Sequence, residues 1–221
     1  MRRTILICVW LLAAAAAGRA MAVPPAQQPG RVVDRIVARM EDDIILQSQV
    51  RELGAFQQLI EGREESDDQL LSELIEQWVV QTEAASSRFP EPAQSEVDRE
   101  LARLTSNFAS PAAYSAKLNE LGLSASQVRQ LLVRQIYVER YLDYKFRPSV
   151  LIESADIDAY YQKELLPELA KKNQPAPARS EVEEQIRELL IQRGISNLTA
   201  KWLDETKSRL KIEMTPSGAK S

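Results

Sequence analysis

The sequence predicts a mostly helical protein with a small β part, and three observations lead to this prediction. Aromatic residues make up only 6% of the chain and there are seven glycines, whereas Leu, Ala, Glu, Gln and Arg are frequent. This composition favours helices over sheets. Apolar residues recur at helical spacing over much of the chain. Strand-like apolar runs occur near its two ends, at 32–46 and 210–214.

The N-terminus has the features of a secretory signal peptide. Two arginines precede an apolar run at 5–17, and an A-x-A cleavage site ends at Ala22. The run is shorter than the roughly 20 residues that span a bilayer, and it ends in small residues. We therefore expect residues 1–22 to be cleaved off and the mature chain to begin at Val23. The alternative is an uncleaved N-terminal anchor.

The charge and cysteine content limit the possible partners. Removing residues 1–22 takes away three arginines and the only cysteine, which leaves 25 basic and 32 acidic residues and a net charge of −7. Disulfides are then excluded, so packing alone must stabilise the fold. The acidic balance argues against binding to nucleic acid and against docking on anionic lipid. We expect other proteins as partners and no stable membrane insertion after cleavage.

Most familiar catalytic sites are excluded because the chain has no histidine. Ser-His-Asp and Cys-His catalysis, His-ligated zinc or haem and an imidazole pH switch all need that residue. Acidic pairs occur at 42–43, 67–68 and 156–158, but each lies at a turn or a helix start. Aspartate is favoured there by capping and by the helix dipole, so we interpret these pairs as structural. We expect no metal and no cofactor.

The mature chain begins with a leader and a hairpin. Residues 23–30 are rich in Pro and Gln and are expected to be disordered. Two apolar runs, at 32–40 and 44–46, flank an acidic tripeptide and predict a β-hairpin. An isolated hairpin is marginal in water and needs a third strand or a helix against it. Ser48 is then predicted to cap a helix that ends at Gly62.

Further start and stop signals divide the next segment into helices. Ser66 or Asp67 begins a helix whose apolar stripe runs from Leu70 to Trp78. Pro92 is placed as the first-turn proline of a third helix, which continues through Leu104. The cap-plus-proline signal recurs at 110–111, and that fourth helix ends at Gly122. A capping box at 124–127 begins a long helix that ends at about Phe146.

This long helix is apolar on two sides. One stripe contains Val128, Leu131, Leu132, Ile136, Val138, Leu142 and Phe146, and the roughly opposite side contains Val133, Tyr137, Tyr141 and Tyr144. A helix of this kind is either central to its domain or presents one side to a partner. We favour central packing. An exposed tyrosine face is the alternative, because the tyrosine hydroxyl tolerates water.

The C-terminal third predicts a short helix, a linker, a long helix and a strand. The short helix begins at 154 and is expected to end near Pro167, and residues 171–179 form a polar, proline-containing linker. Helical periodicity returns from 180 through Leu203, with Gly194 as a candidate interruption. Residues 210–214 alternate at period two and predict a closing strand. The tail at 215–221 is expected to be disordered.

The run at 32–50, VVDRIVARMEDDIILQSQV, resembles the start of the mature SurA-type periplasmic chaperones. In that family a valine-rich strand, an acidic turn and an I-L-x-S sequence lead into a helix capped by the serine. The matching positions are Val32, Val33, Ile36, Val37, Ile44, Leu46 and Ser48. The helices at 70–82 and 126–146 are similar to those of the family's N-terminal domain. The segment at 180–212 is similar to its C-terminal helix and closing strand.

The chain departs from the family in one important respect. Family members usually carry one or two parvulin-type prolyl isomerase domains, of roughly 90 residues each, between those parts. Only 18 residues separate Tyr161 from Ser180, and the histidines that the parvulin site typically uses are absent. The resemblance therefore implies a multi-helix chaperone core without an isomerase. Residues 31–170 would form the N-terminal-like domain, and 180–214 would pack back on it, with the last strand completing the hairpin.

The function that the resemblance implies is ATP-independent binding of unfolded envelope proteins, such as outer-membrane proteins, in the periplasm. Candidate client-binding residues are Tyr137, Tyr141, Tyr144, Phe108 and Tyr114, although core packing is favoured for each one individually. The first alternative is a non-catalytic interaction or scaffold subunit of an envelope complex, which would have one contiguous apolar patch. The second is a carboxylate enzyme, which would have a deep pocket with converging Asp and Glu.

Overall fold

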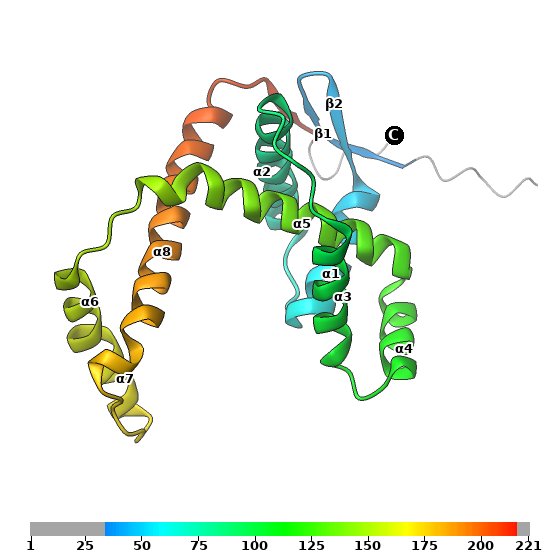
Figure 1. Ribbon diagram of the computed structural model, residues 1–221. Coiled ribbons are helices and arrows are strands. Elements are labelled where there is room, and N and C mark those ends of the chain that lie inside the picture. Colours follow the sequence, from blue (N-terminus) through cyan, green and yellow to red (C-terminus); the bar gives the residue numbers. More distant parts are fainter. Residues whose placement is uncertain (1–33, 216–221) are drawn as a thin grey trace, which may run out of the picture. The chain divides into compact units, whose positions relative to one another are not determined.

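The computed structural model describes residues 34–215, which are mostly helical and include a three-stranded antiparallel sheet (Figure 1). The predicted fold class is therefore confirmed. The expected signal peptide at 1–22, the leader at 23–30 and residues 216–221 of the expected tail lie outside the described residues. In chain order the elements are β1 (Ile36–Met40), β2 (Asp43–Leu46), α1 (Gln47–Glu61), α2 (Asp67–Ser86), α3 (Gln94–Ser106), α4 (Pro111–Leu121), α5 (Ala125–Phe146), the 3₁₀ turn η1 (Arg147–Ser149), α6 (Ser154–Tyr160), the π-helical turn η2 (Tyr161–Leu165), α7 (Leu166–Lys171), α8 (Arg179–Lys207) and β3 (Ile212–Met214).

The sheet joins the two ends of the described chain. Its strand order is β2-β1-β3, and β3 pairs with β1 antiparallel, with Ala38 opposite Met214. Thr215 continues the pairing, because its N–H donates to the Val37 carbonyl oxygen at 2.9 Å. One face of the sheet packs on α1 and α2, where Met40, at 1% exposure, is part of a shared apolar cluster. The predicted closing strand is therefore confirmed, and it supplies the third strand that the hairpin needs.

Several predicted helix signals have the expected geometry. The side chains of Ser66, Ser110 and Ser124 each accept a backbone N–H at the start of α2, α4 and α5. The residues that follow α1 and α4 are Gly62 and Gly122, each with φ of 68°. A left-handed residue at this position satisfies the last carbonyls of a helix at no steric cost to glycine. These helix boundaries follow directly from local sequence.

Two predicted helix starts are wrong. Helix α1 begins at Gln47, before Ser48, whose backbone N–H donates to the Asp34 carboxylate at 3.2 Å. A carboxylate that precedes β1 in the chain therefore performs the capping that we assigned to the serine hydroxyl. Helix α3 begins at Gln94 with Ala93 as its N-cap, so Pro92 lies just outside the helix and not in its first turn.

One predicted helix end is also wrong, and one candidate interruption is absent. The helical path that begins at Ser154 continues past Pro167 to Lys171 through the π-helical turn η2, where Leu166 N–H donates to the Tyr161 carbonyl. The wider turn accommodates a proline, which lacks an N–H and would clash with the carbonyl of an ordinary preceding turn. Helix α8 runs without interruption through Gly194, which lies against Val150 of the segment between η1 and α6.

Helix α5 is the central element, as its two apolar sides predicted. It contacts α1, α2, α3 and α8. Its N-terminal half belongs to a core cluster with α1, α3 and α4 that includes Val128 at 0% exposure. Its C-terminal half packs with α2 and α8 around Val80, Tyr141 and Leu203. Among residues 34–215, none of the helices is long and apolar enough to cross a membrane.

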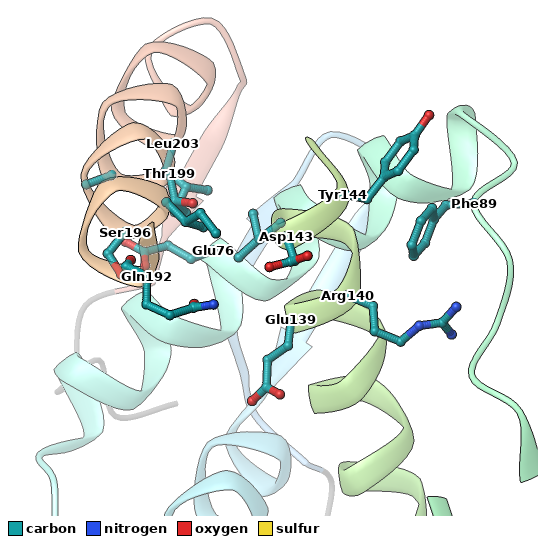
Figure 2. Close-up of a pocket in the computed structure, with 13 residues that line it drawn as sticks. Glu76, Phe89, Glu139, Arg140, Asp143, Tyr144, Gln192, Ser196, Thr199 and Leu203 are labelled. Atoms are coloured by element: carbon teal, nitrogen blue, oxygen red, sulfur yellow. Dashed lines mark hydrogen bonds between the residues drawn. The ribbon is translucent and has the colours of Figure 1, made fainter. Parts of the chain in front are cut away.

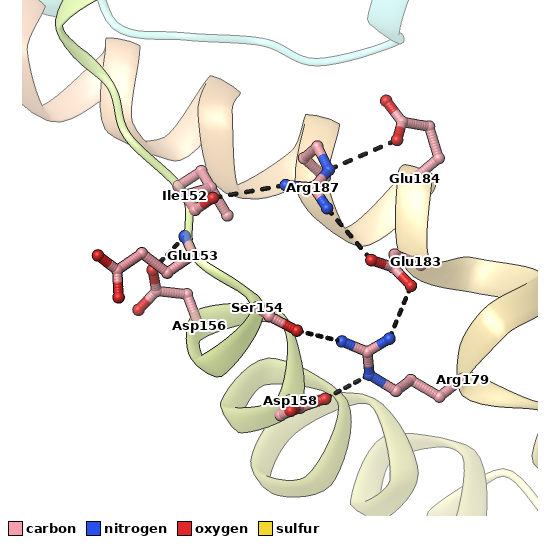
Figure 3. A network of polar contacts seen from close by, with 9 residues as sticks. All are labelled: Ile152, Glu153, Ser154, Asp156, Asp158, Arg179, Glu183, Glu184 and Arg187. Carbon is pink, nitrogen blue, oxygen red and sulfur yellow. Dashed lines mark hydrogen bonds and ion pairs between the residues drawn. The ribbon is translucent and has the colours of Figure 1, made fainter.

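Charged side chains attach the first half of α8 to α6 and to the end of α5. Figure 3 shows Arg179 between Asp158, Ser154 and Glu183, with Arg187 bound to the same glutamate at 3.2 Å. At the end of α5, the Arg147 guanidinium donates to both carboxylate oxygens of Glu188, at 2.7 and 3.0 Å. Such exposed pairs contribute little to stability, so their main effect is to fix the orientation of α8 relative to α5 and α6.

Candidate binding groove

A groove lies where α5 and α8 pass each other next to α2. Its larger part has a volume of about 980 Å³, and a narrower part of about 280 Å³ continues towards α1. The two parts share Glu76, Glu139, Leu142, Thr199 and Leu203, so we treat them as one α5–α8 groove. Figure 2 shows Gln192, Ser196 and Thr199 on α8 opposite Glu139 and Asp143 on α5.

The floor of the α5–α8 groove is apolar. In its narrow part the lining includes Leu53 and Phe56 from α1, Val80 from α2, Leu131 from α5 and Leu203 from α8. These residues are 2–6% exposed and also belong to the core clusters. The groove is therefore an opening onto the core itself, at the place where α8 leaves part of α1, α2 and α5 uncovered. Such a floor suits apolar side chains.

The rim of the groove carries carboxylates, and their partners differ. Glu76 is paired with Lys207, whose Nζ lies 2.8 Å from Oε1, and Asp143 is paired with Arg147 at 2.8 Å. Glu73 accepts side-chain amide hydrogens from Gln57 and Gln77, and Glu139 accepts one from Gln135. Within residues 34–215, neither Glu73 nor Glu139 has a cationic partner. Burial raises the pKa of the Glu73 carboxyl, and the amide hydrogen bonds oppose this shift.

Three buried polar atoms of residues in the groove lining have no hydrogen-bond partner in the described structure. They are Oε1 of Gln57, a side chain that is 6% exposed, Oγ1 of Thr199 and Nη1 of Arg140. The Gln57 amide group is held by the bond from its Nε2 to Glu73. A buried acceptor without a donor costs about 1–3 kcal/mol. The groove therefore offers unused hydrogen-bonding capacity beside an apolar floor.

An aromatic cluster lies at the wide end of the groove. Phe89 is within 5.3–5.8 Å, centroid to centroid, of the rings of Tyr137, Tyr141 and Tyr144. The Arg140 guanidinium stacks on Phe89, with Cζ 5.5 Å from the ring centroid. Figure 2 shows Phe89 and Tyr144 beside Arg140 at the groove lining. Tyr144 is 66% exposed, so this end combines an accessible aromatic ring with a fixed cation.

The structure separates the five candidate client-binding residues. Tyr137 and Tyr141 are 7% and 2% exposed and pack on α2, with the Tyr137 hydroxyl donating to the Phe89 carbonyl at 3.3 Å. Phe108 and Tyr114 form an edge-to-face pair, 5.3 Å between centroids, against the core cluster of α3 and α4. Of the five, Tyr144 alone lines the α5–α8 groove. Core packing, the interpretation we favoured for each residue individually, therefore describes Tyr137 and Tyr141.

Sequence reasoning missed the polar residues of the groove. Gln57, Glu73 and Glu139 lie on three different helices. Glu139 falls within an apolar stripe of α5 and Gln57 within that of α1, at helical spacing from apolar residues on either side. Thr199 and Ser196 lie on α8, and their position against α5 depends on tertiary packing. The available signal was a polar residue inside each apolar stripe, which does not show that the two side chains converge. Residues 34–215 contain no cluster of three or more Cys, Asp or Glu side chains arranged to hold a metal ion.

Comparison with models of protein families finds no match, and comparison with curated proteins finds none either. The resemblance to SurA-type chaperones consequently stays a prediction based on the residues quoted above. What the geometry offers is an open, apolar-floored, acidic-rimmed groove lined by residues of α1, α2, α5 and α8. This arrangement fits binding of an extended polypeptide.

Proposed function

We propose that the chain is an ATP-independent chaperone that holds unfolded envelope proteins, outer-membrane proteins among them, in the periplasm, and that it has no prolyl isomerase activity. The α5–α8 groove is the client-binding site. The observation that supports this most directly is the opening of the groove onto the apolar core between α1, α2, α5 and α8.

The groove suits weak and exchangeable binding. Its floor consists of the edges of residues that are otherwise buried, so the apolar area available to a client is modest. Burial of apolar area contributes roughly 25 cal/mol per Å², and much of that gain is offset by the cost of ordering the client chain. A holdase needs clients to bind quickly and to leave again. The acidic rim also keeps the protein soluble while it exposes an apolar surface.

The test is suppression of aggregation. A urea-unfolded outer-membrane β-barrel protein is diluted into buffer with and without residues 23–221, in the absence of nucleotide, and light scattering is followed. We expect a concentration-dependent delay in scattering. The variant Ala200→Trp fills the groove from the exposed face of α8, and Asn197→Trp adds the same bulk at an exposed α8 position outside the groove lining. Only Ala200→Trp should shorten the delay.

A pull-down from envelope extract distinguishes this function from that of a scaffold subunit. Many unfolded barrel proteins among the captured partners support the holdase, whereas one folded partner at a fixed stoichiometry would assign the chain to a complex. Equal scattering with and without the protein would refute the proposal. In a separate assay, acceleration of cis/trans exchange on proline peptides that survives repurification would contradict the absence of isomerase activity.

A further inference from the structure

The narrow part of the α5–α8 groove gathers hydrogen-bond acceptors of one kind. Glu73, Glu139 and Gln57 all line its 280 Å³ volume. Neither carboxylate has an ion-pair partner within residues 34–215, and the Gln57 oxygen has no donor. The ligand that complements such a set carries several N–H donors and a positive charge.

The cations that line the same groove do not neutralise these acceptors. Arg134 is paired with Glu52 of α1, with 3.9 Å between its guanidinium and that carboxylate. Arg140 stacks on Phe89 and lies 3.6 Å from Glu96. Lys207 is bound to Glu76 at 2.8 Å. Each lining or adjacent cation therefore has a carboxylate of its own, and the narrow part keeps a negative field.

The floor beneath these acceptors selects for a particular shape of cation. Leu53, Phe56, Val80 and Leu131 form an apolar surface there. Arginine and lysine carry three or four methylenes before the charged group, and these stems pack along apolar surface while the head reaches polar atoms. A small inorganic cation would leave this floor uncovered. Burial destabilises the charged form of the Glu73 carboxyl and so raises its pKa. A positive charge placed beside this carboxylate would offset that cost.

We propose that the narrow part of the groove is a specificity pocket for an arginine or lysine side chain of an extended, otherwise apolar client segment, bound by Glu73, Glu139 and the amide oxygen of Gln57. This inference rests on the proposed holdase function and adds the class of client segment. Neighbouring apolar client residues occupy the wider part, between α5 and α8. The pocket selects segments in which a basic residue interrupts an apolar stretch.

A pair of labelled peptides tests the proposal. Both are extended apolar ten-residue peptides, one with a central arginine and the other with citrulline, which keeps the shape but removes the charge. Binding is measured by fluorescence anisotropy to residues 23–221. We expect the arginine peptide to bind about 10-fold more tightly, as for a charge-assisted hydrogen bond against a neutral one. The preference should shrink in 0.5 M salt.

Variants connect the preference to the pocket. In Glu73→Gln/Glu139→Gln the two peptides should bind equally. The matched control Glu184→Gln/Glu205→Gln removes the same charge from exposed positions on α8 outside the groove lining and should keep the 10-fold preference. Because Glu73 is half-buried, the single variant Glu139→Gln, at an exposed position, is included in case the double variant unfolds. It should lower the preference by several fold.

The outcomes separate this inference from the proposed function. Equal binding of both peptides to the unmodified protein would overturn the specificity pocket and leave the holdase proposal in place. A preference that survives Glu139→Gln and the double variant would also overturn it. Binding of neither peptide would remove support from both proposals. If the protein were then dimeric at the same concentration, the groove would be assigned to a second copy of the chain.

Discussion

Replacing Gly194 by alanine should destabilise the protein although it lies in the interior of a helix. In an exposed helix interior, glycine to alanine stabilises by about 1 kcal/mol. At this position a Cβ would lie 2.5 Å from Cγ1 and 2.9 Å from Cγ2 of Val150. Carbon atoms normally stay about 3.5–4.0 Å apart, so one of the two segments must move.

The size of the expected effect follows from the two opposing contributions. Val150 is a β-branched side chain with restricted rotamers, so it cannot simply turn away. Overpacking of this kind costs about 1–3 kcal/mol, against a propensity gain of about 1 kcal/mol. We expect Gly194→Ala to lower the free energy of unfolding by about 1 kcal/mol, a lowering of the midpoint temperature by roughly 2–4 °C for a chain of this size.

A double-mutant cycle isolates the contact. In the Val150→Ala background the clash is removed, and Gly194→Ala should then stabilise by about 0.5–1 kcal/mol, which gives a coupling of roughly 2 kcal/mol. Urea unfolding followed by circular dichroism at 222 nm measures all four proteins. If Gly194→Ala stabilises equally in both backgrounds, α8 does not pack on the segment after α5 as described, and the orientation of the groove wall is wrong.

Three further predictions concern the C-terminal segment. Trp202 is half-buried against Phe146, with 5.9 Å between ring centroids. Trp202→Ala should therefore lower the free energy of unfolding by about 1.5–3 kcal/mol, less than the 3–5 kcal/mol of a fully buried tryptophan. A value below about 0.5 kcal/mol in urea titration would contradict the contact. The Arg147 guanidinium lowers the pKa of Glu188 to about 2, so this pair contributes stability above pH of about 4.5 and loses it as the pH falls towards 2. Because both side chains are largely exposed, the loss is at most about 1 kcal/mol, and it should be missing from Glu188→Gln when the two proteins are compared by urea unfolding at pH 6 and pH 3. Truncation after Pro177 removes α8 and β3 and uncovers the α2–α5 cluster, so the fragment should aggregate; a soluble, monomeric, cooperatively unfolding fragment would show that the two parts fold independently.

Local sequence predicted most of the helix ends and the β-hairpin, because those features depend on neighbours along the chain. The serine caps at 66, 110 and 124 and the glycines at 62 and 122 each satisfy backbone groups within a few residues. The wrong boundaries have tertiary causes. Asp34, which precedes β1, takes the capping role assigned to Ser48. Gly194 is needed for close approach to Val150, not for a helix break.

The candidate site was predicted less well, and the reason is physical. An apolar stripe looks the same in a sequence whether it fills a core or lines a groove. Tyr137 and Tyr141 share a helix face with Tyr144, yet α2 covers the first two and leaves the third 66% exposed. What separates them is how far α2 and α8 extend along α5, which depends on packing between distant segments. Periodicity carries no information on that extent.

Under the proposed function, the same packing would make client binding and stability depend on each other. Leu131 and Leu203 are core residues and also line the groove floor, so a client side chain on this floor would shield the core from water. Ligands that bind only the folded state raise its stability according to their concentration and affinity. A groove closed by a better-fitting α8 would give a more stable protein without a binding site. If the groove binds clients as proposed, the open floor and the unpartnered Gln57 oxygen are the places where this fold gives up stability for binding.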